Sequence, residues 1–189
     1  ESSSWRFYTS KDGMRESWVQ SISLAPDRTL LINHGNVDRM SIYDGYQMKQ
    51  LPSPAPGRDV IENRAGQLWS IRSESPLIFV QWIDGKWKEC PVPPPDTNWQ
   101  PGRTPFYPLM RDQIVYLLAD RILLFNEQEK SVTVIQNATR TQQGRFYDMA
   151  YSPQNDGLWI TEEHGVVLLR KGATNTVEDL RWEEFPLPD

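Results

Sequence analysis

Two histidines, each followed by a glycine, are the side chains with the most evident potential for chemistry in this sequence. His34-Gly35 and His164-Gly165 occupy equivalent places, each between two apolar segments. A neutral imidazole can contact a ligand or a metal ion, but a His-Gly pair also suits a turn in which glycine adopts a positive φ. Because no Cys and His residues cluster at the spacing of a metal site, we favour turns and expect no metal. Both histidines remain candidates for ligand contact.

Acidic residues at turns form a second group with potential chemistry. Glu162-Glu163-His164 could act as a carboxylate–histidine pair, and Asp44 and Asp84 could bind calcium. A solvated loop and ordinary Asp-Gly turns explain these positions better. The sequence has no G-x-S-x-G, P-loop or G-x-G-x-x-G motif, so we expect neither an enzyme nor a cofactor.

The elements that position these residues repeat along the 189-residue chain. Four copies each contain an apolar pair directly after a turn, and the pairs begin at Leu30, Leu68, Val115 and Leu158. The spacings of 38, 47 and 43 residues are close to the period of about 40–45 residues that is typical of propeller blades.

Each copy contains four short strand candidates, and we find no amphipathic helical window. The first strands are predicted at 18–24, 58–62, 104–110 and 145–151, and the last strands at 47–51, 86–90, 131–135 and 181–185. Central strands such as 122–125 are apolar on both faces, as expected when sheets stack on both sides. The sequence therefore predicts an all-β chain, a β-propeller of four-stranded antiparallel blades, with repeats at about 10–52, 53–92, 93–137 and 138–187. Residues 5–9 are predicted to form an extra outer strand.

Composition and charge exclude several classes of function. A hydrophobic content of 38% and eight Trp residues support a packed interior. The net charge of −5 without a basic stripe argues against binding to nucleic acid or to an anionic membrane surface. No run of 18 apolar residues occurs, so we expect no membrane insertion. The single Cys90 excludes an internal disulfide framework.

Short motifs around the turns carry a family resemblance. Asp12-Gly13-Met14, the segment from Asp27 to Leu31 and Tyr43-Asp44-Gly45 follow one another within residues 5–45, and Asp156 to Thr161 repeats part of this order. The arrangement resembles the two-component regulator propeller repeat. The resemblance implies a periplasmic or extracellular sensor portion of a bacterial signalling protein, with about seven blades. Four blades could close as a small ring, form half of an eight-bladed ring in a homodimer, or belong to a larger propeller.

Two proline-rich connectors are predicted on the same face as the His34 and His164 hairpins. They span residues 51–59 and 90–108. Rigid chain with exposed aromatic residues can form a recognition surface, although a simple spacer between blades is the plainer interpretation. The candidate ligand contacts are His34, Asn36, Arg58, Trp99, Arg103 and His164.

The sequence thus predicts a non-catalytic β-propeller that binds a small molecule, a glycan or another protein domain. Binding would favour one arrangement of domains and pass that bias onward. Two alternatives remain open. A propeller-type lyase or glycosidase acting on a polysaccharide needs acids and bases that converge on one pocket. A purely structural interaction module needs a large apolar face at the end of the blade stack.

Overall fold

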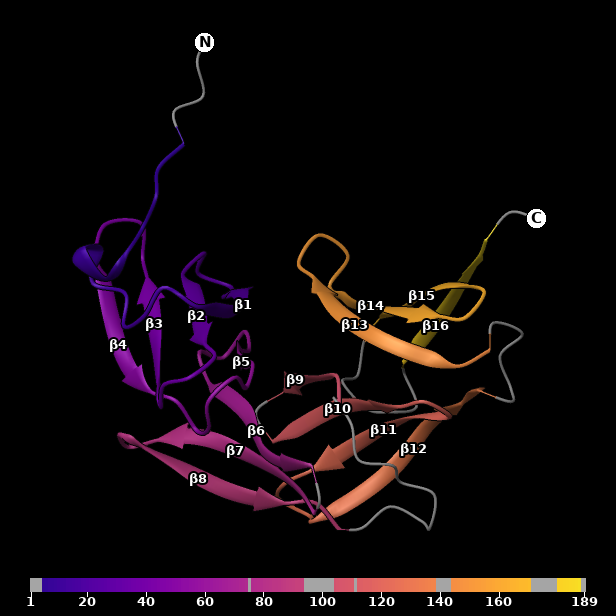
Figure 1. Ribbon diagram of the computed structural model, residues 1–189. Helices are drawn as coiled ribbons and strands as arrows, with labels where there is room; N and C mark the ends of the chain where they lie inside the picture. Colours follow the sequence, from indigo (N-terminus) through magenta and orange to yellow (C-terminus); the bar gives the residue numbers. More distant parts are fainter. Residues whose placement is uncertain are drawn as a thin grey trace. The chain divides into compact units, whose positions relative to one another are not determined.

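The chain folds into antiparallel β-sheets. The computed structural model describes residues 5–74, 76–93, 104–110, 112–138, 144–170 and 180–187. In these residues, 16 strands form four antiparallel four-stranded sheets, and in each sheet the strands lie side by side in chain order (Figure 1). This confirms the predicted four-stranded blades of a β-propeller, and we number them blades 1 to 4.

The strand bounds agree closely with the predicted segments. Blade 1 contains β1 (Val19–Leu24), β2 (Leu30–His34), β3 (Arg39–Tyr43) and β4 (Met48–Pro52). Blade 2 contains β5 (Val60–Glu62), β6 (Leu68–Glu74), β7 (Leu77–Ile83) and β8 (Lys86–Pro91). Blade 3 contains β9 (Phe106–Met110), β10 (Gln113–Leu118), β11 (Arg121–Asn126) and β12 (Ser131–Asn137). Blade 4 contains β13 (Phe146–Ser152), β14 (Gly157–Glu162), β15 (Gly165–Arg170) and β16 (Arg181–Pro186).

The chain divides into two compact units, each with two blades. Unit 1 comprises residues 1–73 and 77–91 and contains blades 1 and 2, apart from the end of β6. Unit 2 comprises residues 74–76 and 92–189 and contains blades 3 and 4.

The core of unit 1 lies between the faces of its two blades. Leu31 and Met40 from blade 1 pack against Val60 and Leu68 from blade 2. Trp87 of β8 lies at the edge of this cluster, where its Nε1 donates a hydrogen bond of 2.9 Å to the carbonyl oxygen of Pro52. The apolar central strands therefore bury their side chains between sheets, as the sequence predicted.

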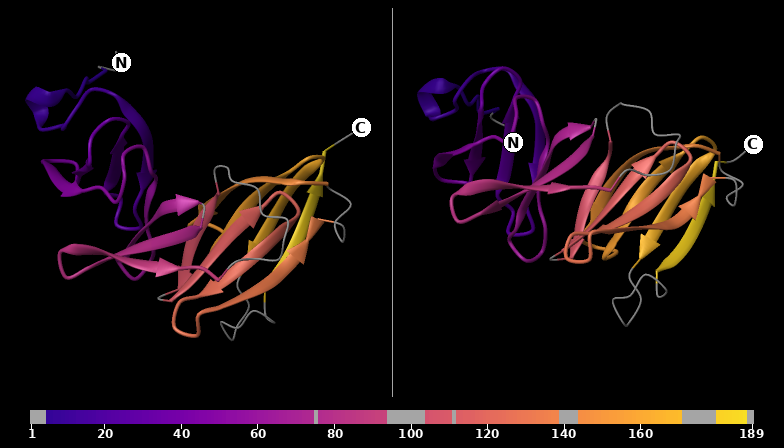
Figure 2. Two further views of the ribbon diagram at one scale, coloured as in Figure 1. Left: turned by 60° about the horizontal axis from the view of Figure 1, so that its bottom comes forward. Right: turned by 90° about the horizontal axis from the view of Figure 1, so that it is seen from below.

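Unit 2 is held together by the same kind of stacking. The sheets of blades 3 and 4 lie face to face in Figure 2. Tyr107 of blade 3 stacks on Tyr151 of blade 4, with 4.7 Å between the ring centroids. In blade 4 itself, the rings of Phe146 and Trp182 meet edge to face at 6.3 Å.

Tight turns with left-handed residues connect the strands. The Asp44 carboxylate accepts hydrogen bonds from the backbone N–H groups of Tyr46 (3.0 Å) and Gln47 (2.9 Å). Asp84 and the following Gly85 both adopt a positive φ, of 50° and 78°. These bonds and dihedrals confirm that the two Asp-Gly sequences serve the turns.

The predicted extra strand at residues 5–9 is wrong. These residues have no strand pairing, and Trp5 and Phe7 are 88% and 81% exposed. The segment meets blade 1 through side chains instead, because the Tyr8 hydroxyl lies 2.8 Å from the Tyr43 hydroxyl. A 3₁₀ turn, η1 (Ser10–Asp12), follows it.

The predicted alignment of the third repeat is shifted by one residue. Leu118 and Arg121 are the last pair of the β10–β11 hairpin, and Glu162 and Gly165 are the last pair of the β14–β15 hairpin. Leu118 and Glu162 are therefore equivalent positions. Val115 and Trp159 each lie three residues before them, so Val115 is equivalent to Trp159 and not to Leu158 as predicted. A shift by one residue moves every side chain of a strand to the other face of its sheet.

Candidate functional site

Connectors and hairpins meet at one end of blades 1, 3 and 4, which we call the connector end. In unit 1 the hairpin at residues 35–38 and the connector at 53–59 are bound through their backbones. The N–H of Gly57 donates to the carbonyl of His34 (3.0 Å), and the N–H of Ser53 donates to the carbonyl of Asp38 (2.7 Å). The loops that leave the sheet are therefore fixed to one another.

Unit 2 has the same arrangement at its two hairpins. The N–H of Phe146 donates to the carbonyl of Ala119 (3.1 Å), and the N–H of Glu163 donates to the carbonyl of Arg145 (3.0 Å). The carbonyl of His164 accepts from the N–H of Leu187 (2.9 Å). Rigidly held loops at the end of a sheet are a common place for binding residues.

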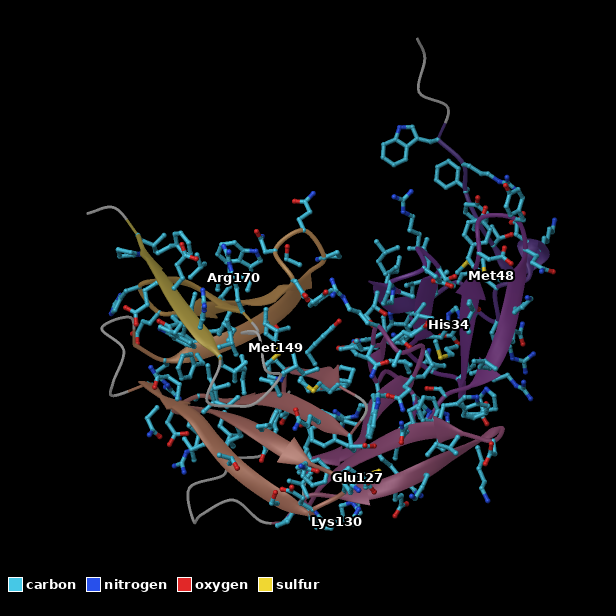
Figure 3. All side chains as sticks on the ribbon, turned by 180° about the vertical axis from the view of Figure 1, so that it is seen from behind. His34, Met48, Glu127, Lys130, Met149 and Arg170 are labelled. Atoms are coloured by element: carbon cyan, nitrogen blue, oxygen red, sulfur yellow. The ribbon has the colours of Figure 1, made fainter. Side chains whose placement is uncertain are left out.

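His34 does not lie where the sequence placed it. It is the last residue of β2 and is 2% exposed, and Figure 3 shows it among the side chains of blade 1. Its Nε2 lies 2.8 Å from the buried hydroxyl of Ser41, whereas Nδ1 has no hydrogen-bond partner among the described residues. The expectation that it occupies a turn is wrong, because β2 continues through His34, which pairs with Val19 of β1.

Asn36 and Arg58 lie at the connector end of unit 1. Asn36 is exposed, and its backbone N–H donates to the carboxylate of Glu16 (3.2 Å). Arg58 is half-buried. The backbone contact between Gly57 and His34 brings the segments that carry these candidates together. The remaining unit 1 candidate, His34, points away from solvent.

His164 is exposed in the turn between β14 and β15, as predicted. The two histidines therefore differ, because one is buried in a strand and the other is exposed in a turn. Trp99 and Arg103, in the proline-rich connector, lie outside the described residues.

Glu162 is the most unusual charged residue at the connector end of unit 2. It is 6% exposed, and neither carboxylate oxygen has a hydrogen-bond partner among the described residues. Burial raises the pKa of its carboxyl to about 7, and the negative charge of Glu184 adds to the increase. A carboxyl with this pKa exchanges a proton near neutral pH, which is common at functional sites.

Other charged groups besides Glu162 lie at the connector end of unit 2. The adjacent Glu163 is exposed, and its carboxylate accepts a hydrogen bond of 3.4 Å from the backbone N–H of Arg145. At the neighbouring hairpin, Arg121 forms an ion pair of 2.7 Å with Asp120. The connector end of unit 2 therefore presents both acidic and basic groups on a fixed backbone.

The strand phase could have identified Glu162 as a buried residue. Leu158, Ile160 and Glu162 alternate along β14, and all three are buried. We expected a solvated loop for residues 162–164, which is correct for Glu163 and His164 and wrong for Glu162. The period of two was the available signal.

Within the described residues, no group of three or more His, Cys, Asp or Glu side chains could hold a metal ion. No helix in the same ranges combines the length and apolar character needed to cross a bilayer.

Comparison with known proteins places the fold. No family model matches the chain, and no curated protein matches its sequence. The structure of a streptogramin B lyase superposes with a TM-score of 0.57 at 18% identity, over 89% of this chain and 54% of the lyase chain. The chain has a β-propeller fold. At this identity the likeness concerns the fold alone.

Two further propellers illustrate the range of proteins with this fold. YCF48 from Cyanidioschyzon merolae matches with a TM-score of 0.51 and 13% identity, over 86% of this chain and 57% of its own. The extracellular domain of a hybrid two-component system from B. thetaiotaomicron matches at 0.50 and 13%, over 94% of this chain and 22% of its own. This propeller chain thus spans about half the length of the lyase and of YCF48.

Proposed function

We propose that this chain is a non-catalytic β-propeller module that binds a partner at the connector ends of its blades. The observation that carries the proposal is the backbone bonding between connectors and hairpins, seen in both units. Loops held in this way display Asn36 in unit 1, and Glu163 and His164 in unit 2, on a fixed scaffold. Preorganised loops lower the entropic cost of binding.

The setting that we propose is the extracytoplasmic sensor portion of a bacterial signalling protein. The motif resemblance of residues 5–45 supports it, and so does the presence of a sensor domain among the proteins of similar fold. The partner would be a small molecule, a glycan or a protein domain, and its binding would bias the arrangement of neighbouring domains.

A thermal-shift screen of the intact chain tests this proposal. The probes are panels of small molecules, oligosaccharides and synthetic peptides, because a ligand of the folded state raises Tm. We expect that His164→Ala or Asn36→Ala abolishes the shift produced by a hit. Tyr46→Ala is the control, since Tyr46 is 97% exposed beside the Asp44-Gly45 turn, which is not a connector end.

Two outcomes would contradict the proposal. The binding surface would lie elsewhere if hits bound unchanged to both connector-end variants and lost binding in the Tyr46 variant. Mass-spectrometric detection of cleavage products from an oligosaccharide hit would favour the alternative of a lyase or glycosidase.

A further inference from the structure

The first strand of blade 1, β1, places its polar side chains toward the neighbouring blade and its apolar side chains toward solvent. Its serines face the neighbouring blade: Ser23 Oγ donates to the carbonyl of Val60 (2.8 Å), and Ser21 Oγ donates to the Asp59 carboxylate. Ile22 and Leu24 point the other way and are 60% and 64% exposed. A sheet with one solvated face places its polar residues on that face. The apolar side of β1 is therefore unlike a solvated face.

The position equivalent to Ile22 in blade 2 is covered by a neighbouring blade. In blade 1 the first residue of the second strand, Leu30, pairs with Leu24, and Ile22 lies two residues before Leu24. In blade 2 the first residue of the second strand, Leu68, pairs with Glu62, and Val60 lies two residues before Glu62. Ile22 and Val60 are therefore equivalent positions. Val60 is fully buried, because blade 1 covers it with Leu31 and neighbouring apolar side chains. The same position is covered in blade 2 and open in blade 1.

The N-terminal segment covers only part of this outward face of blade 1. Tyr8 reaches Tyr43, Met14 is buried, and the N–H of Arg15 donates to the hydroxyl of Ser41 (3.4 Å). These contacts lie over β3, so the apolar half formed by β1 stays open.

Blade 4 carries a face of matching chemistry. Trp159 occupies the repeat position of Leu31, the residue that covers Val60 in unit 1. It is half-buried and lies 5.4 Å from the ring of Phe185, which is 38% exposed and pairs across the strands with Val166. The outward face of blade 4 thus carries apolar side chains like those with which blade 1 covers Val60, but here they are partly exposed to solvent.

We propose that the outward face of blade 1 (Ile22, Leu24) binds the outward face of blade 4 (Trp159, Val166, Phe185) of a second copy of the chain. The contact would extend the type of interface that already joins blades 1 and 2, in which an apolar face with Leu31 covers Val60. Two different faces make the contact heterologous. The proposal does not depend on partner binding at the connector ends.

Sedimentation velocity over a roughly hundredfold range of concentration measures the association. We expect the chain to self-associate, and Ile22→Lys with Leu24→Lys to raise Kd by about tenfold or more, because two charges would be buried at the interface. Val134→Lys is the matched control, since Val134 is 44% exposed on β12 of blade 3. It should leave the association unchanged.

Mixing two defective variants tests which faces meet. Phe185→Lys alone should lose association, and so should the Ile22/Leu24 double variant. Their mixture should form a heterodimer, because one chain keeps the blade 1 face and the other keeps the blade 4 face. Circular dichroism of each variant reports whether it is folded.

Cysteine variants give a readout that does not depend on the lysine variants folding. Ile22→Cys in one copy and Phe185→Cys in another should form an intermolecular disulfide, and Val134→Cys should not. The proposal is overturned if the unmodified chain stays monomeric at all concentrations, or if Phe185→Lys associates as well as the unmodified chain.

Discussion

Glu162 links burial to pH at the scale of a single residue. Its pKa rises from 4.5 to about 7 because the carboxyl is buried beside Glu184. In the unfolded chain the group ionises above pH 4.5, whereas in the folded chain it stays protonated until about pH 7. The folded state is therefore favoured by this group at low pH, and the advantage is lost as the pH rises through 7.

We predict that the free energy of unfolding falls by about 3 kcal/mol between pH 4.5 and pH 8 through Glu162. Glu162→Gln should remove this slope, and above pH 7 it should stabilise the chain by about 1–2 kcal/mol. Urea titrations at a series of pH values measure both effects. Glu163→Gln is the control, because Glu163 is exposed and should leave the slope in place. An unchanged slope in the Glu162 variant would contradict the assignment.

Residue types and turn motifs predicted some of the site and left other parts out. The exposed turn at His164 follows from a short hairpin between two apolar strands. The surroundings of His34 could not be inferred from its own strand, because its partner Ser41 also accepts a hydrogen bond from the N–H of Arg15, which lies far from both in sequence. Contacts of this kind depend on tertiary packing.

At the scale of elements, the positions of the strands were predictable, because turns and apolar runs mark them. It was harder to predict which side chains of a strand lie on which face of the sheet. The segment Ile114–Leu118 is apolar throughout, so its sequence carries no period of two and the repeat was aligned one residue late. The polar-apolar alternation of β1 does carry a phase, but which side is covered depends on the neighbouring sheet.

Trp69 and Trp159 occupy equivalent positions in their blades but differ in burial. Trp69 is fully buried. Trp159 is half-buried, because it lies on the outward face of blade 4.

We predict different stability effects for the two tryptophans. Trp69→Ala should cost about 3–5 kcal/mol, the range for a large side chain removed from a core. Trp159→Ala should cost roughly 1–2 kcal/mol, because part of its surface already meets water. Guanidinium unfolding curves measure the difference. Equal costs would show that Trp159 is also buried in solution.

Gly144 lies where the connector before β13 packs against Glu163 of the β14–β15 hairpin. It adopts a φ of +84°, and a Cβ at this position would lie 2.7 Å from the Cβ of Glu163. Gly144→Ala should therefore combine left-handed strain with a clash and destabilise the chain by about 2 kcal/mol.

Gly45→Ala is the matched control for this substitution. Gly45 has a φ of +96°, and a Cβ there would have no neighbour within 4 Å. It should cost only about 1 kcal/mol of backbone strain. Thermal unfolding at one pH compares the two, and equal costs would show that the connector does not press on the hairpin.

At the scale of the whole molecule, the blades form two compact units, each with its own core. In repeat proteins, stability is approximately a sum of the stabilities of the repeats and of the contacts between neighbours. Local opening can then occur in one part of the chain while another part remains protected. The two cores should respond separately to substitution.

We therefore predict that a core substitution lowers amide-exchange protection mainly in its own unit. Val60→Ala, at a fully buried position of unit 1, should cost about 2 kcal/mol and reduce protection in β1–β8. Ile160→Ala, at a fully buried position of blade 4, should reduce protection in β9–β16 instead. Hydrogen exchange read by mass spectrometry resolves the two halves, since each variant serves as the control for the other. Equal loss of protection throughout the chain in both variants would show that all four blades unfold together, and that the two cores do not act as separate cooperative units.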